Sequence, residues 1–111
     1  MSDVRRIIVA SDAGISIGCS ADISEALAAC LGSHGLILTE SDLGPGVFDL
    51  RTGLAGELFQ KFINYKVPVA IVLPTPEAYG ERFTELARKH STHGIIRFVR
   101  SKEEAAGWLC G

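Results

Sequence analysis

The chain lacks the features that mark several large classes of protein. Its three cysteines are scattered and odd in number, which is not the pattern of a disulfide framework. No apolar run approaches the roughly 20 residues that a membrane-spanning helix needs. The net charge is −2 and the two signs are intermixed, so there is no basic stripe for nucleic acid or an anionic membrane. The start, MSDVRR, leads into a strand-like run rather than a signal peptide, so we expect a cytoplasmic protein.

Motifs of several enzyme classes are missing as well. The sequence contains no G-x-G-x-x-G and no P-loop, so nothing indicates a nucleotide-binding fold. No G-x-S-x-G turn is present to activate a nucleophile such as Cys19 or Ser20. His90 and His93 are spaced as two metal ligands are in some sites, but no acidic or cysteine cluster accompanies them. We therefore expect solvated loop histidines, no metal, no cofactor and no identifiable catalytic residue.

What the sequence does contain is an alternation of apolar elements. Strand-like runs cover Val4–Ala10, Ile15–Ile17, Gly35–Thr39, Val67–Leu73 and Ile95–Val99. Helices are expected to begin near Ser20 or Asp22, at Thr52, at Thr75-Pro76 and at the capping box Ser101–Glu104. The order β-β-α-β-α-β-α-β-α predicts an α/β fold with a single mixed, mostly parallel sheet and about four helices. We expect one domain over residues 1–111, in which the first two strands could form a hairpin.

The most distinctive segment is FDLRTGLAGELFQKF, residues 48–62, where a polar, glycine-containing turn opens a helix of large apolar residues. The turn follows a strand and therefore lies at the carboxyl edge of the sheet, where α/β proteins collect ligand sites. A helix N-terminus also attracts anions. The candidate binding residues are Asp49, Arg51, Thr52, Gly53 and Glu57, with Thr52 also expected as the helix N-cap.

A purely structural interpretation of the same turn stays open. Thr52 would then merely cap the helix and Gly53 would merely permit a tight turn. Gly56 requires a reason in either interpretation, because a glycine inside a helix costs up to about 1 kcal/mol relative to alanine. Close packing of that helix against a strand supplies a reason as readily as function does.

Residues 48–72, FDLRTGLAGELFQKFINYKVPVAIV, closely resemble the core motif of an uncharacterised bacterial family, the domain of unknown function 4180. The resemblance continues more weakly through ARKHSTHGIIRFVRSKEEA, residues 87–105. Members of that family usually follow the AIV strand with Gly-Asp, whereas this chain has Leu73-Pro74. The resemblance implies no established activity.

The order of elements also resembles that of STAS domains, the sulfate-transporter and anti-sigma-antagonist fold. In many such domains an Asp-Ser-Ser-Gly-Leu turn begins the second helix, and a partner kinase phosphorylates its first serine. The matching stretch here is Leu50-Arg51-Thr52-Gly53-Leu54, which keeps the Gly-Leu pair. Arg51 takes the place of the phosphorylated serine and Thr52 that of the second. The resemblance therefore implies that the switch is absent or has moved to Thr52.

We expect a small cytosolic binding or regulatory module that docks a protein partner or a small anionic ligand around residues 49–53. Arg51 would pair with an anionic group, Asp49 would orient the turn, and Thr52 would be the residue for modification or hydrogen bonding. The alternative is a small enzyme that holds an anionic substrate at the same helix N-terminus. A third interpretation is a self-associating subunit, for example a homodimer, which an exposed patch containing Phe48 and Phe59 would indicate.

Overall fold

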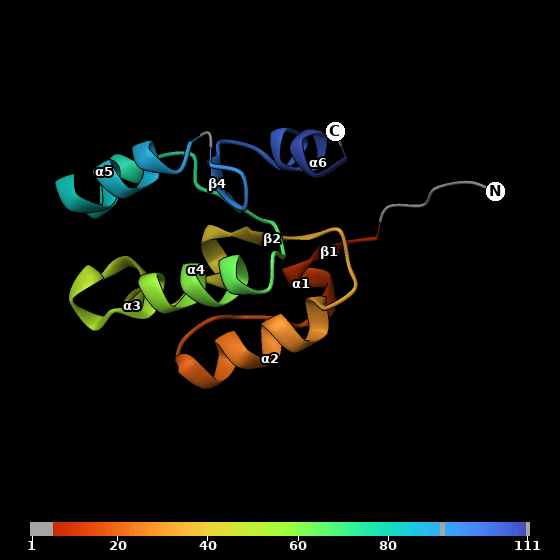
Figure 1. The fold of residues 1–111 in the computed structure, drawn as a ribbon. Helices are drawn as coiled ribbons and strands as arrows, with labels where there is room; N and C mark the ends of the chain where they lie inside the picture. Colours follow the sequence, from red (N-terminus) through yellow and green to blue (C-terminus); the bar gives the residue numbers. More distant parts are fainter. Residues whose placement is uncertain (1–5, 92, 111) are drawn as a thin grey trace.

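The computed structural model describes residues 6–91 and 93–110 of the chain. Strands are β1 (Ile7–Val9), β2 (Gly35–Thr39), β3 (Val69–Val72) and β4 (Ile96–Val99). The α-helices are α1 (Ala10–Ala13), α2 (Ser20–Cys30), α3 (Pro45–Phe48), α4 (Leu54–Asn64), α5 (Glu81–Lys89) and α6 (Lys102–Cys110). Single 3-10 turns occur at η1 (Glu40–Asp42), η2 (Leu50–Thr52) and η3 (Pro76–Tyr79). The α/β class expected from the sequence is confirmed (Figure 1).

The four strands form one sheet in the order β1-β2-β3-β4, and every neighbouring pair is parallel. Registers such as Leu36 with Val69 and Ile71 with Phe98 align the central strands. Alternate residues of each strand point to opposite faces, because the side-chain period of a strand is two. Strand β3 is buried on both faces, as its continuous apolar run predicts.

One face of the sheet carries the larger core. Leu36, Leu38, Val69, Ile71 and Ile96 pack there against the helices that connect successive strands. Those helices contribute Ile23 and Leu27 from α2, Leu58 and Phe62 from α4, and Phe83 and Ala87 from α5. Figure 1 shows α2 and α4 side by side, in agreement with their direct contact. Every helical connection between strands therefore covers this one face.

The opposite face is covered by α6. Ala105 and Leu109 of that helix pack on Ile37, Ala70, Val72 and Val99. The indole of Trp108 lies beneath the Arg97 guanidinium, whose carbon is 4.6 Å from the ring centroid, a cation–π contact. The chain thus changes sides of the sheet only after β4.

The prediction of a second strand at Ile15–Ile17 is wrong. Residues Ala10–Ala13 form the short helix α1 instead, which ends at Gly14 with φ of +71°. Ile17 makes an isolated parallel bridge to Leu43 and is fully buried, so its apolar character reflects burial rather than strand pairing. No hairpin forms among the described residues, and the sheet has one strand fewer than the STAS-like order. Residues 4 and 5 of the expected first strand lie outside the described residues.

Helix α2 begins at Ser20, which is one of the two expected starts. Asp22 is not its cap, because the Asp22 carboxylate accepts a hydrogen bond from Gly18 N at 2.9 Å. At Ser101 half of the capping box is confirmed. Ser101 Oγ accepts from Glu104 N at 3.1 Å, but the Glu104 carboxylate accepts from Arg100 N.

The histidines between α5 and β4 are structural rather than solvated. His93 Nδ1 accepts hydrogen bonds from Ile95 N and Ile96 N, both at 3.1 Å, so this nitrogen is unprotonated. The His90 carbonyl accepts from Phe98 N at 3.0 Å, and its ring packs 5.0 Å from that of Phe59. The turn therefore lies along the outer edge of β4.

Cys30 is fully buried among core residues, as the helical spacing predicts. Burial raises the pKa of its thiol to about 11, against a smaller lowering by the Arg6 charge. Among the described residues, none of the helices has the length and apolar composition needed to cross a membrane.

Candidate functional site

The turn predicted as the site lies between α3 and α4, on the side of the sheet where β2 and β3 end (Figure 1). Pro45 occupies the first turn of α3, which ends at Phe48, and Gly53 bends the chain into α4 with φ of +75°. Only glycine adopts that left-handed conformation without strain. The single 3-10 turn η2 between these points carries Arg51 and Thr52 outward, and both residues are exposed.

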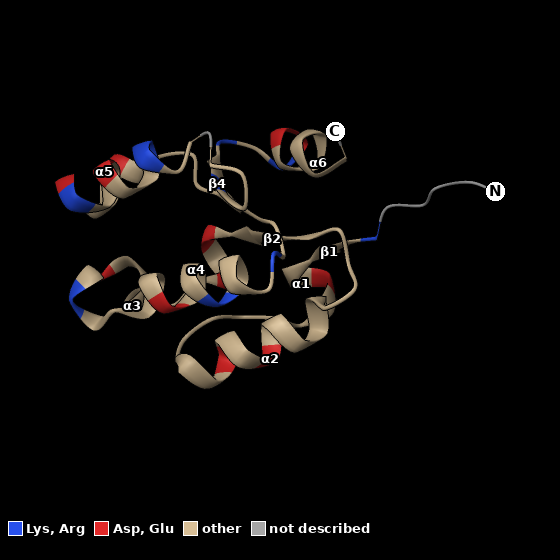
Figure 2. Cartoon of the chain, viewed as in Figure 1, with Lys and Arg blue, Asp and Glu red and all other residues tan. Residues whose placement is uncertain are grey.

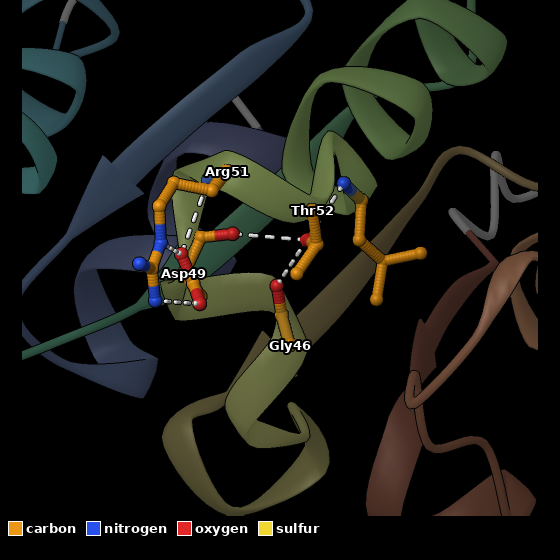
Figure 3. A network of polar contacts seen from close by, with 5 residues as sticks. Gly46, Asp49, Arg51 and Thr52 are labelled. Carbon is orange, nitrogen blue, oxygen red and sulfur yellow. Dashed lines mark hydrogen bonds and ion pairs between the residues drawn. The ribbon is translucent and has the colours of Figure 1, made fainter.

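Asp49 and Arg51 form a bidentate pair within this turn (Figure 3). Arg51 Nε donates to Asp49 Oδ1 and Arg51 Nη2 to Oδ2, both at 2.9 Å, while Arg51 N also donates to Oδ1 at 3.1 Å. The hydrogen bonds from the Arg51 side chain, and then from its backbone, lower the pKa of the Asp49 carboxyl. The same pair raises the pKa of Arg51. The Arg51 side chain is 87% exposed, so this pair lies at the surface of the molecule.

The Thr52 side chain makes hydrogen bonds within the turn and to both flanking helices. Its hydroxyl is within hydrogen-bond distance of two acceptors, Gly46 O at 2.7 Å and Asp49 O at 2.9 Å (Figure 3). The same oxygen accepts from Leu54 N at 3.1 Å. The N-cap of α4 is Gly53 rather than Thr52, so the expected position was wrong by one residue. The Thr52 hydroxyl nevertheless satisfies the first N–H of the helix, which is the chemical purpose of a cap.

Glu57 does not join the other four residues through its side chain. Its carboxylate accepts from Ser20 Oγ at 2.6 Å and lies 3.9 Å from Lys61 Nζ, on the side of α4 that meets α2. The structure therefore brings together Asp49, Arg51, Thr52 and Gly53, whereas Glu57 links two helices.

An open pocket of about 440 Å³ adjoins the turn, and no sequence pattern predicts it. One wall is Phe48 with residues 49–51, and the other is the segment from Tyr79 to Phe83. The rings of Phe48 and Tyr79 stack 3.9 Å apart at an angle of 10°, and the Tyr79 hydroxyl donates to Glu40. No local periodicity relates residues so far apart in the chain, so only the fold reveals this aromatic wall.

Phe59 is buried, with 6% of its surface exposed, and its ring packs edge-on to Phe98. The exposed patch of Phe48 and Phe59 is therefore not formed.

Gly56 has open space where a Cβ would lie, so close packing against a strand does not explain why a glycine stands inside this helix.

Asp42 is a buried acidic residue close to the turn in sequence. Its Oδ2 accepts from Thr39 N at 2.8 Å and Thr39 Oγ1 at 2.9 Å, which closes a capping box on η1. No group of three or more His, Cys, Asp or Glu side chains within residues 6–91 and 93–110 is placed to hold a metal ion.

The Asp49–Arg51 pair leads to a pH prediction. Replacing Arg51 by glutamine should raise the pKa of Asp49 towards its ordinary value, because the charged donor is lost. Since the folded-state pKa is lowered, the pair stabilises the fold above the unfolded-state pKa of Asp49. That contribution disappears as the pH falls through the folded-state value. An NMR titration of the Asp49 carboxyl carbon in both proteins measures the change. The Arg88→Gln variant, which removes the exposed Glu85–Arg88 pair, should leave the titration unchanged.

The chain matches no curated protein and no solved structure. A family described as a domain of unknown function (DUF4180) matches residues 2–109, which includes the turn and both walls of the pocket. The chain therefore belongs to the DUF4180 family.

Proposed function

We propose that this chain is a small regulatory binding module that docks a protein partner at the Asp49–Gly53 turn. The observation that carries the proposal is one polar turn in which Arg51 and Thr52 are exposed and the polar groups are hydrogen-bonded to one another. Three hydrogen bonds hold Arg51 on Asp49, and the Thr52 hydroxyl contacts both the chain before the turn and the start of α4. A surface that is already ordered loses little conformational entropy on binding.

The chemistry of the docking segment follows from the groups around the turn. Arg51 presents a planar cation, and its Nη1 donates to no described residue, so one edge of the guanidinium is available to a carboxylate or phosphate. The stacked Phe48 and Tyr79 rings offer an apolar surface beside it. A partner segment with an acidic group next to an apolar side chain would meet both features. Phosphorylation of Thr52 would remove its donated hydrogen bond and add charge to the turn, so it would alter docking.

An enzyme that holds an anionic substrate at the same helix N-terminus is a weaker proposal. The carboxylate nearest the turn is Asp49, and its lowered pKa makes it a poorer base. The pocket beside it is also open to solvent rather than enclosed.

The proposal is tested by capture of partners from native cytosol with tagged wild-type protein, Arg51→Ala and Thr52→Glu. The readouts are the partners retained and the mass of the bait. A partner retained by the wild type should be lost from both variants. Its affinity for purified Arg51→Ala should fall roughly 10- to 100-fold, the effect of losing a charged hydrogen-bonded contact. Lys102→Ala, a surface cation at the start of α6, and Thr52→Ser, which keeps the hydroxyl, should bind as the wild type does. Equal retention by Arg51→Ala would show that the turn is not the docking site.

Gly56 allows stability and docking to be separated. Gly56→Ala and Gly107→Ala each fill open space in an exposed helix position, so both should stabilise the protein by about 0.5–1 kcal/mol. Only Gly56→Ala places its methyl group on the first turn of α4, and it should weaken binding of the purified partner. If both variants bind the partner equally, the bare backbone at Gly56 serves no docking purpose.

A further inference from the structure

The chain leaves strands β3 and β4 towards opposite faces of the sheet. After β3 it passes through η3 into α5, whose Phe83 and Ala87 pack on the face shared with α4. After β4 it enters α6, whose Ala105 and Leu109 pack on the other face (Figure 1). Connections that part in this way from adjacent parallel strands leave a crevice at the carboxyl edge of the sheet, which is where open α/β folds bind ligands. The connections from β1 and β2 both lie on the α4 face, so this parting occurs at β3 and β4.

A crevice of about 240 Å³ lies at that point, separate from the pocket beside the Asp49–Gly53 turn. The strand ends supply Leu73, Phe98 and Val99, and α5 supplies Ala87, which together make its floor apolar. The volume is small, close to the lower limit of about 300 Å³ for ordinary ligand pockets. It therefore suits a molecule of only a few carbon atoms.

The polar groups of the crevice come from three elements. Arg100 follows β4, Arg88 lies on α5, and Glu77 lies on η3. Arg100 Nη1 donates to Pro74 O at 3.0 Å, which ties the connection after β3 to that after β4 and orients the guanidinium. Its Nε and Nη2 donate to no described residue. The charge of Arg88 is already met by Glu85, 2.5 Å away.

Charges of both signs are distributed over α5 and its surroundings rather than concentrated (Figure 2). The carboxylate of Glu77 makes no hydrogen bond or ion pair with a described residue, and because Glu77 lines the crevice it adds a negative charge there. Arg100 therefore supplies one oriented positive charge for an anionic ligand. A ligand with a second negative charge would be repelled by Glu77. Arg100 is the natural partner for a carboxylate, because its fork matches the two carboxylate oxygens.

We propose that the crevice between the connections after β3 and β4 binds a small monocarboxylate with an apolar body. Its carboxylate pairs with the free edge of Arg100, and its apolar body lies on Leu73 and Phe98. This site is independent of the Asp49–Gly53 turn, so either proposal can fail alone.

Hexanoate is the probe, added to ¹⁵N-labelled full-length protein while amide chemical shifts are followed by NMR. Saturable shifts should appear at Thr84, Ser91 and Arg100, which line the crevice, and not at the turn. Arg100→Gln should weaken binding roughly tenfold, whereas Arg100→Lys should retain part of it. Arg51→Ala should bind hexanoate as the wild type does. An absence of saturable shifts at the crevice, or equal affinity in Arg100→Gln, would overturn the proposal.

Matched probes of the same length test the chemistry of the ligand. Hexan-1-ol and hexylamine lack the carboxylate and should bind more weakly than hexanoate, and adipate should be repelled by Glu77. Should Arg100→Gln fail to fold, Glu77→Gln decides the question, because Glu77 is exposed and its carboxylate makes no hydrogen bond or ion pair with a described residue. That variant should bind adipate more tightly than the wild type does. Hexylamine binding as tightly as hexanoate, or adipate binding unaffected by Glu77→Gln, would contradict the proposal.

Discussion

Replacing Phe83 by alanine is expected to lower the free energy of unfolding by about 3–5 kcal/mol. Phe83 is 1% exposed, and its ring joins the aromatic wall to the core. Its centroid lies 5.3 Å from that of Phe48, 5.8 Å from that of Tyr79 and 5.7 Å from that of Phe98. The alanine variant removes all three contacts and leaves a cavity between α5 and the sheet.

Urea denaturation followed by circular dichroism measures this loss. Phe83→Leu keeps most of the apolar volume and should cost much less. Tyr79→Phe retains the ring stack and loses only the hydrogen bond to Glu40, so it should change stability by about 1 kcal/mol. A loss below 1 kcal/mol in Phe83→Ala would mean that α5 is not held on the sheet through this ring.

Replacing Gly35 by valine is expected to lower the free energy of unfolding by about 2–6 kcal/mol. Gly35 opens β2 with φ of +155°, and a β-branched residue there is strained by about 1–3 kcal/mol. A Cβ would also lie 2.6 Å from Leu109 Cδ2 and 3.1 Å from the Pro68 carbonyl oxygen. Overpacking of this kind adds about 1–3 kcal/mol. The added side chain should therefore force α6 away from the sheet.

Trp108, the single tryptophan of the chain, lies on α6 and reports such a movement directly. Its fluorescence emission should shift to longer wavelength in Gly35→Val as the helix is displaced, together with a lower urea midpoint. Gly107→Ala on the same helix is the control, since a Cβ there meets no atom within 4 Å. Wild-type stability and emission in Gly35→Val would refute the close contact between β2 and α6.

Much of the fold was predictable because burial and local chemistry agree along the chain. The runs at residues 35–39, 67–73 and 95–99 are short and apolar, as buried strands are, and each contains an observed strand. The prediction of a strand at Ile15–Ile17 failed because buried isoleucines in a loop give the same apolar pattern as a strand. Ile17 pairs only with Leu43, which lies after the next strand, and no local pattern contains that relation.

The turn of the candidate site was predictable for the same local reason. Asp49, Arg51, Thr52 and Gly53 are consecutive or nearly so, and their contacts stay within a short segment from Gly46 in α3 to Leu54 at the start of α4. The aromatic wall was not predictable, because Phe48 and Tyr79 meet only through packing of α3 against η3. The contact of Glu57 was not predictable either, because its partner Ser20 comes from α2.

The histidine turn beside β4 has a consequence for how this protein behaves at high concentration. A parallel sheet of four strands has two outer edges, and an unpaired edge is a template on which another chain can add a strand and start aggregation. At β4 the N–H groups of Ile96 and Phe98 are already bonded to His93 Nδ1 and the His90 carbonyl. An incoming strand would have to displace that turn before it could pair with either group. His90 and His93, which resemble metal ligands in the sequence, thus protect one side of the sheet against intermolecular β-pairing.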